Sequence, residues 1–213
     1  MKYERKFIVS NLYETSKSKI SENMALLAAS AKKFEVYDLD RLKDIFCKEY
    51  RHSEKIKSCD AYFYNQYNHL VVEFKNAHHL RLKEYYDEIE IKIIDTHMLL
   101  GETFLKNKKG TEAGKKVRLL VVYNDAMNYG TGVRKISDAL NAMKPMTGDK
   151  TRNSKLPPIF HDDNEFRMVV DATKQRYEAE FFKEIFFIDK ETFEEEYIKA
   201  DYFQKLEEWH GMS

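Results

Sequence analysis

The sequence contains little cysteine, glycine or proline, and each shortage excludes a class of protein. Its 213 residues include 2 cysteines, 7 glycines and 3 prolines. Two cysteines cannot form the disulfide framework of a small secreted domain, and neither belongs to a CxxC pair, so we expect both to be reduced thiols. So few glycines and prolines argue against a collagen-like sequence, a repeat array and a long flexible linker.

The chain also lacks an excess of charge of either sign and any long apolar run. It has 36 Lys and Arg residues and 36 Asp and Glu residues, so a nucleic-acid surface must come from local segregation of charge. The longest aliphatic run, Leu119 to Val122, is too short to span a membrane, and the first residues lack the apolar stretch of a signal peptide. We therefore expect a cytoplasmic protein that does not bind membranes.

Apolar and aromatic residues are nevertheless abundant. Hydrophobic residues make up 43% of the sequence, including 14 Phe and 14 Tyr, which is enough to form a sizeable core in one domain. Some segments repeat apolar residues at helical spacing, whereas others are the continuous apolar runs typical of strands. We expect helices at about 13–33, 40–52, 81–104, 133–143, 172–180 and from 191 onward, strands at 60–64, 69–74, 117–123 and 182–188, and a long loop at 144–167.

This order of elements predicts one α/β or α+β domain over residues 1–213, with a small mixed sheet flanked by helices. Strands 60–64 and 69–74 are expected to pair as an antiparallel hairpin. Strand 117–123 has the continuous apolar character of a strand buried on both faces. Asp40 is predicted to be the N-cap of the second helix.

The end of the predicted hairpin carries polar residues whose spacing indicates a site. Side chains alternate along a strand, so Glu73 and Lys75 point to one face while Phe74 points to the core. Asp60 begins the opposite strand and is expected to lie near Lys75. Two carboxylates and the Phe74 carbonyl supply the oxygen ligands that Mg²⁺ or Mn²⁺ prefers. Lys75 would orient or deprotonate the attacking water, or stabilise negative charge on a phosphate.

At these residues the sequence resembles the PD-(D/E)xK nuclease superfamily, which has a restriction-endonuclease-like fold. Cys59-Asp60 stands where the family has Pro-Asp, and Glu73-Phe74-Lys75 stands where it has (D/E)-x-K. The resemblance implies hydrolysis of phosphodiester bonds with Mg or Mn as cofactor. It also implies that Asp60, Glu73 and Lys75 are catalytic and that the two carboxylates bind the metal. In an ordinary domain, Glu73 and Lys75 would simply form an ion pair at a strand end.

The resemblance also implies a division of the chain. The family core is a helix, a three-stranded antiparallel meander, a helix and a further strand, and it matches about residues 40–145. An N-terminal helical region at 13–52 and a C-terminal α/β extension at 168–208 lie around this core. Members of the family often add a metal-binding glutamate from the helix before the hairpin, and Glu49 or Glu22 could fill that role. Either glutamate could equally be solvated.

Basic residues are concentrated in two segments. Residues 106–118 include six basic residues against one acidic residue, and a second basic set lies at 134–155. Each segment could bind phosphates or be a solvated loop. Lys92, on the longest predicted helix, could hold the scissile phosphate or form a surface ion pair with Asp95. The predicted nucleic-acid-binding residues are Lys92, Lys108, Lys109, Lys115, Lys116 and Arg134.

Three further features carry weaker signals. Residues 178–208 hold eleven acidic residues and four lysines, so this segment should turn away from nucleic acid or bind a basic protein partner. The turn at 128–133 resembles a phosphate-binding turn, but Lys135 takes the place of the third glycine of GxGxxG, which favours a plain helix-entry turn. His78 and His79 lack the usual spacing of zinc ligands.

The sequence therefore predicts a divalent-metal-dependent nuclease that acts on DNA in preference to RNA, in defence or DNA processing. A homodimer would allow cleavage of both strands. The alternative is a catalytically inactive nuclease-like fold that serves as a protein-binding, immunity-like or regulatory module. A third hypothesis is a nucleotide-binding enzyme that uses the turn around Gly130.

Overall fold

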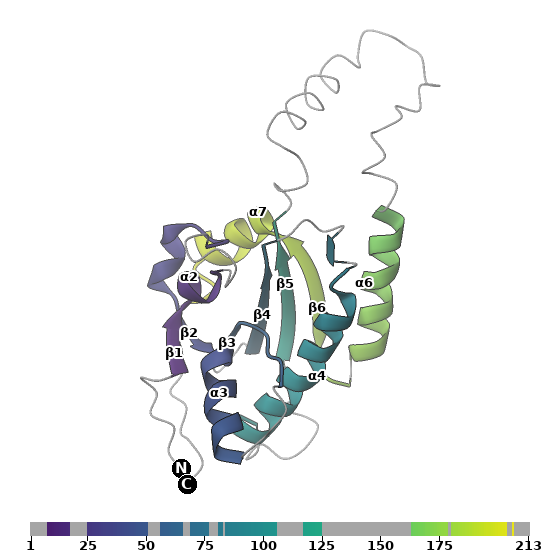
Figure 1. Ribbon diagram of the computed structural model, residues 1–213. Helices are drawn as coiled ribbons and strands as arrows, with labels where there is room; N and C mark the ends of the chain where they lie inside the picture. The colour runs from purple at the N-terminus through teal and green to yellow at the C-terminus, as the bar shows by residue number, and fades with distance from the viewer. Residues whose placement is uncertain are drawn as a thin grey trace, which may run out of the picture.

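A six-stranded mixed sheet with strand order β1-β2-β3-β4-β5-β6 forms the centre of the protein (Figure 1). The computed structural model describes residues 8–17, 25–50, 56–65, 69–76, 81–82, 84–105, 117–124, 163–178, 180–203 and 206. The strands are β1 (Val9–Asn11), β2 (Glu35–Asp38), β3 (Ala61–Tyr64), β4 (His69–Lys75), β5 (Val117–Tyr123) and β6 (Glu184–Asp189). The first four strands pair antiparallel, whereas β4, β5 and β6 are parallel to one another.

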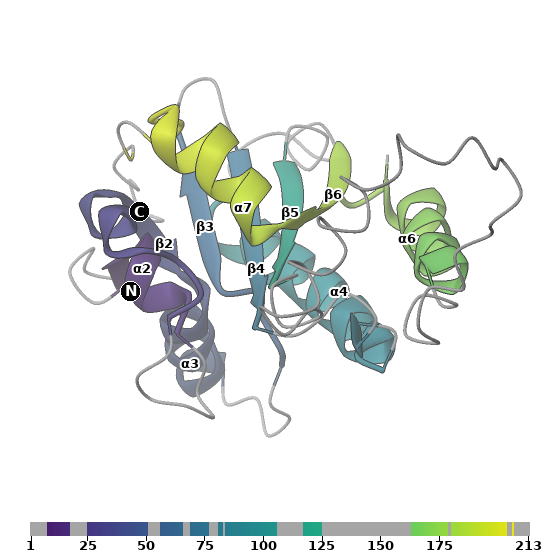
Figure 2. The same ribbon diagram turned by 90° about the horizontal axis from the view of Figure 1, so that it is seen from above.

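Helices cover both faces of this sheet. The described helical elements are α2 (Leu12–Thr15), the 3₁₀ helix η1 (Ala29–Lys33), α3 (Leu39–Tyr50), α4 (Tyr86–Thr103), α6 (Asp163–Tyr177), α7 (Lys190–Phe193) and the π-helix η8 (Glu194–Lys199). Figure 2 shows α4 on one face of the sheet, called the α4 face below, and α7 on the other, the α7 face. Helix α6 lies beside α4, where Arg176 pairs with Glu90 at 3.1 Å.

The core forms where apolar strands meet these helices. Strand β5 is central, and its aliphatic residues from Leu119 to Val122 are all fully buried, as expected for a parallel strand covered on both faces. On the α7 face, the rings of Phe74 and Phe193 pack with centroids 5.9 Å apart, and those of Phe63 and Phe203 lie 5.1 Å apart. Aromatic packing therefore covers the α7 face of β3 and β4, the two strands that carry the predicted site.

Much of the predicted architecture is confirmed. The protein is a mixed α/β fold with a mixed sheet flanked by helices. The hairpin is β3 and β4, with Ala61 facing Val72 and Tyr64 facing His69. Strands β5 and β6 and helices α3 and α4 lie close to the predicted ranges. These are the segments with the longest and most regular apolar patterns.

The helix predicted at about 13–33 is wrong. Helix α2 ends at Thr15, and Lys17 and Ala25 form an isolated antiparallel bridge, which a continuous helix would not allow. The next helical element among the described residues is η1. Ser16 is buried and bonds this segment together, because its carbonyl and its hydroxyl accept hydrogen bonds from the N–H groups of Leu26 and Leu27. Leu26 and Leu27 are thus buried where the chain folds back onto Ser16.

Three smaller predictions also need correction. The side chain that caps α3 is Asp38, whose Oδ1 accepts from the Arg41 N–H at 3.0 Å, and Asp40 is already inside the helix. Helix α6 begins at Asp163, so the end of the loop predicted at 144–167 is helical. The acidic helix predicted from 191 consists of α7 followed by η8. The helix predicted at 133–143 and the rest of the loop lie outside the described residues.

Candidate active site

Asp60, Glu73 and Lys75 come together on the α4 face. Asp60 directly precedes β3, and its N–H donates to the Val72 carbonyl at 3.0 Å. The register of β3 and β4 places it opposite Glu73. The N–H of Phe74 donates to Oδ2 of Asp60 at 2.6 Å, while the Phe74 ring packs on the α7 face. The predicted alternation of side chains along β4 is therefore confirmed.

The Glu73 carboxylate is buried between two lysines. The residue is only 1% exposed. Lys92 Nζ of α4 lies 2.7 Å from Oε1 and 2.9 Å from Oε2, and Lys75 Nζ lies 3.0 Å from Oε1. Burying a carboxylate is costly unless it is paired and hydrogen-bonded. The two ammonium groups satisfy this requirement.

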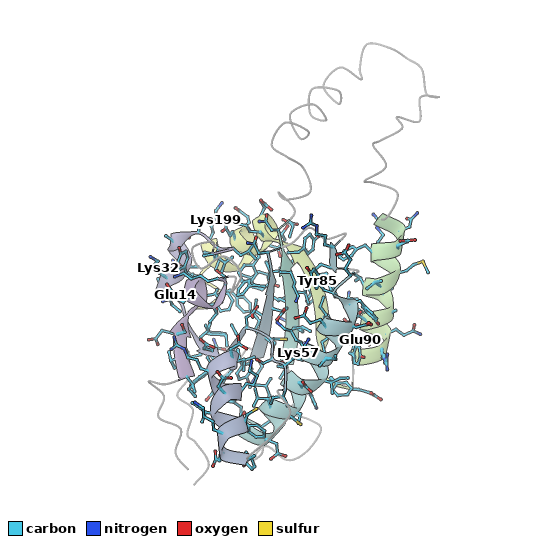
Figure 3. All side chains as sticks on the ribbon, viewed as in Figure 1. Glu14, Lys32, Lys57, Tyr85, Glu90 and Lys199 are labelled. Carbon is cyan, nitrogen blue, oxygen red and sulfur yellow. The ribbon has the colours of Figure 1, made fainter. Side chains whose placement is uncertain are left out.

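Lys75 links the buried carboxylate to the protein surface. Its side chain is 11% exposed, its Nζ lies 3.8 Å from Oε1 of Glu88, and it sits 5.5 Å from the centroid of the Tyr85 ring. Tyr85 is 40% exposed and lies at the start of α4 (Figure 3). The outer side of Lys75 is therefore bounded by an aromatic ring and a second carboxylate.

The carboxylates of Asp60 and Glu73 lie close enough for each to affect the ionisation of its neighbours. Burial and the negative charge of Glu73 raise the pKa of Asp60 to about 8, although Lys92 and the Phe74 N–H oppose the shift. Burial alone would lower the pKa of Lys92, but the charges of Glu73 and Asp60 outweigh it and raise this pKa. Burial also raises the pKa of the Cys59 thiol, so this thiol is not a nucleophile at neutral pH.

Hydrogen bonds hold the segment before Asp60 against two helices. The N–H of Cys59 donates to Thr96 Oγ1 of α4 at 2.8 Å, and the N–H of Lys57 donates to Asp95 Oδ2 of the same helix at 2.7 Å. On the other side, Ser58 Oγ donates to Asp40 of α3 at 3.0 Å. Asp60 is thus placed by rigid elements rather than by a loop alone.

The cluster offers a divalent cation two carboxylates. Among the described residues, no group of three or more His, Cys, Asp or Glu side chains lies close enough to hold a metal ion. The role of Glu49 as a further ligand stays a prediction. Mg²⁺ commonly binds one or two carboxylates and keeps several waters or substrate oxygens. Two buried, mutually repelling carboxylates suit such a cation, and Asp60 and Glu73 would hold it.

The predicted site residues fall into three groups. Asp60, Glu73, Lys75 and Lys92 are brought together, and Lys92 binds Glu73 rather than forming a surface ion pair. Glu49 lies in α3. The other predicted residues lie outside the described part of the chain, namely Glu22, His78, His79, Lys108, Lys109, Lys115, Lys116, Arg134 and the turn around Gly130.

Two neighbours of the cluster were not predicted from the sequence. Tyr85 and Glu88 both lie beside Lys75. Their signal was present, because positions 85, 88 and 92 are three and four residues apart and therefore share one face of a helix. This polar face points toward the end of β4.

Comparisons of this chain with protein-family models, with curated proteins and with solved structures found no match. No helix within the described segments has both the length and the apolar character needed to cross a membrane. The function proposed below therefore depends on the residues and geometry of the cluster.

Proposed function

We propose that this protein is a divalent-metal-dependent nuclease with a restriction-endonuclease-like core, which hydrolyses phosphodiester bonds in DNA in preference to RNA. The observation that carries the proposal is the buried contact of Glu73 with Lys75 beside Asp60, at the adjoining ends of two paired strands. The resemblance of these three residues to the PD-(D/E)xK motif supports the same assignment.

The order of elements around the cluster supports this core in part. Strands β2, β3 and β4 form an antiparallel meander, and α4 then leads to β5, which pairs parallel with β4. One feature departs from the family pattern. Helix α3 lies between the first two strands of the meander instead of preceding it.

Each group has a role that follows from its position. Asp60 and Glu73 would hold a divalent cation, which when bound polarises the phosphate and lowers the pKa of a coordinated water. Lys75 is next to Glu73 but partly accessible, so it would orient the attacking water or stabilise the negative charge that develops on the phosphate. The hydrogen bond from Phe74 keeps the Asp60 carboxylate aimed at Glu73.

The test is cleavage of plasmid DNA, single-stranded DNA and RNA at low salt with Mg²⁺ or Mn²⁺. Wild type is compared with Lys75→Ala, Glu73→Ala and the control Lys33→Met, which breaks an exposed ion pair with Asp201 instead. We expect both site variants to lose at least about a hundredfold in rate and the control to keep wild-type activity. No cleavage with either metal, or cleavage indifferent to both site variants, would contradict the proposal.

A protein-binding or regulatory module with an inactive nuclease-like site is the second candidate. The pairing of both Glu73 oxygens with lysines favours it, because the site is internally neutralised without any ligand. The acidic η8 offers such a module a surface for a basic partner. Metal-dependent cleavage that is lost in Lys75→Ala would exclude this alternative.

A further inference from the structure

Lys92 makes the closest contact with the Glu73 carboxylate. Its Nζ lies 2.7 Å from Oε1 and 2.9 Å from Oε2, whereas Lys75 reaches Oε1 at 3.0 Å. One ammonium group therefore spans both carboxylate oxygens. Both partners are removed from solvent, with side-chain exposures of 16% for Lys92 and 2% for Glu73.

The position of this ammonium group is that of a cation shared by two acids. The negative charge of Asp60 acts on Lys92 together with that of Glu73. A divalent cation bound by the same two carboxylates would carry positive charge into the same space, and like charges a few ångströms apart in a buried site repel strongly.

We propose that Lys92 is a positioning residue that serves as the counter-ion of Glu73 in the metal-free protein and competes with the divalent cation for this carboxylate. The inference rests on the proposed function, because it takes Asp60 and Glu73 as metal ligands. Lys92 neutralises the buried Glu73 carboxylate before the metal binds, and the same positive charge weakens metal binding.

The experiment measures Mn²⁺ binding and thermal stability in the full chain. Free Mn²⁺ is followed by electron paramagnetic resonance, and Tm is recorded with and without Mn²⁺. The variants are Lys92→Met, which removes the charge, Lys92→Arg, which keeps it, and Arg118→Met, which removes a cation paired with Glu184 elsewhere in the sheet.

We expect Lys92→Met to bind Mn²⁺ at least about tenfold more tightly than wild type. Its Tm without metal should be lower than that of wild type, and adding Mn²⁺ should raise its Tm by more. Lys92→Arg and Arg118→Met should bind Mn²⁺ as wild type does. A purely structural role for Lys92 would lower Tm but leave the affinity for Mn²⁺ unchanged.

A folded Lys92→Met protein with unchanged or weaker Mn²⁺ affinity would overturn the inference. If this variant folds only when Mn²⁺ is present, the inference is supported, and if it stays unfolded at every Mn²⁺ concentration, the inference is wrong. If the wild-type protein binds no Mn²⁺, the proposed metal site does not exist and the inference is wrong. Wild-type protein that binds Mn²⁺ with the expected Lys92 effect but cleaves no nucleic acid would contradict the proposed function alone.

Discussion

The N–H of Phe74 donates a hydrogen bond of 2.6 Å to Oδ2 of Asp60 and so ties the start of β3 to the end of β4. The bond brings a second carboxylate to the buried side of Glu73. Repulsion between these two buried carboxylates therefore destabilises the fold at the point where the two strands meet. Sites that are strained in this way are typical of binding and catalysis.

Replacing Asp60 with Asn should stabilise the metal-free protein. The folded-state pKa of Asp60 is raised to about 8, so the folded protein retains a proton that the unfolded chain releases near pH 4. Stability should therefore fall as pH rises from about 4 to about 8. Asn stays neutral and still accepts from Phe74, so Asp60→Asn should raise Tm at pH 8 by about 2–4 °C, corresponding to roughly 1 kcal/mol.

The gain should shrink as pH falls and disappear below about pH 4, where Asp60 of wild type is neutral in both the folded and the unfolded chain. Asp95→Asn is the matched control, since Asp95 also accepts a hydrogen bond from a backbone N–H, that of Lys57. A lower Tm for Asp60→Asn than for wild type at pH 8 would show that the carboxylate is favourable in the metal-free protein. Thermal unfolding followed by circular dichroism across this pH range measures the difference.

The contacts that follow from the alternation of side chains along a strand could be predicted from the sequence. The contacts that depend on how a helix is placed over the sheet could not. The alternation Glu73-Phe74-Lys75 determines which side chains share a face, and the short hairpin sets the place of Asp60. The contact of Lys92 with Glu73 depends on how α4 is rotated over the sheet, which local spacing does not encode. The short strands β1 and β2 escaped prediction because three or four residues carry too little periodicity.

Protonation of His97 should destabilise the protein. Its half-buried ring packs edge-on against Phe181, with centroids 4.8 Å apart, and burial lowers its pKa although a hydrogen bond with the Phe181 backbone opposes the shift. The unfolded chain then takes up a proton more readily than the folded protein. The stability present above about pH 6.5 should be lost as pH falls through the lowered pKa.

His97→Gln keeps a polar side chain but does not titrate, so its Tm should decline less than that of wild type between about pH 7.5 and 5.5. Thermal unfolding at several pH values in this range provides the comparison. Parallel declines for the two proteins would mean that other groups account for the acid sensitivity.

Tyr85 should contribute to binding of single-stranded nucleic acid if the proposed function holds. Its ring is 40% exposed and covers Lys75 at 5.5 Å, so a base of a bound strand could stack on it next to the scissile phosphate. Base stacking on an aromatic side chain contributes about 1–3 kcal/mol. Tyr85→Ala should therefore weaken binding of a single-stranded oligonucleotide at least about fivefold, and Tyr85→Phe should not.

Tyr50 provides the control, because it is 46% exposed but packs on Phe46 at the end of α3. Fluorescence anisotropy with Ca²⁺ in place of Mg²⁺ would measure binding without turnover. Equal losses for Tyr50→Ala and Tyr85→Ala would indicate a general effect of removing a surface ring, and no loss in either would rule out stacking on Tyr85.

Thr96→Val should destabilise the protein and also impair the site. The hydroxyl of this fully buried residue accepts from the Cys59 N–H at 2.8 Å, and valine has the same shape but no acceptor. An unsatisfied buried N–H costs about 1–3 kcal/mol. The lost hydrogen bond holds Cys59, the residue next to Asp60. Metal-dependent cleavage should therefore decrease along with the free energy of unfolding.

Thr103→Val on the same helix is the control that separates a general loss of stability from an effect on the site. Thr103 is also buried, but its hydroxyl donates to the Leu99 carbonyl one turn earlier in α4, a group that can still accept from the helix backbone after Thr103→Val. We therefore expect Thr103→Val to cost less than about 1 kcal/mol and to leave cleavage unchanged. Urea unfolding and the plasmid assay on both variants provide the comparison. Equal destabilisation by the two substitutions would show that α4 tolerates the lost bond to Cys59 and that Thr96 does not position Asp60.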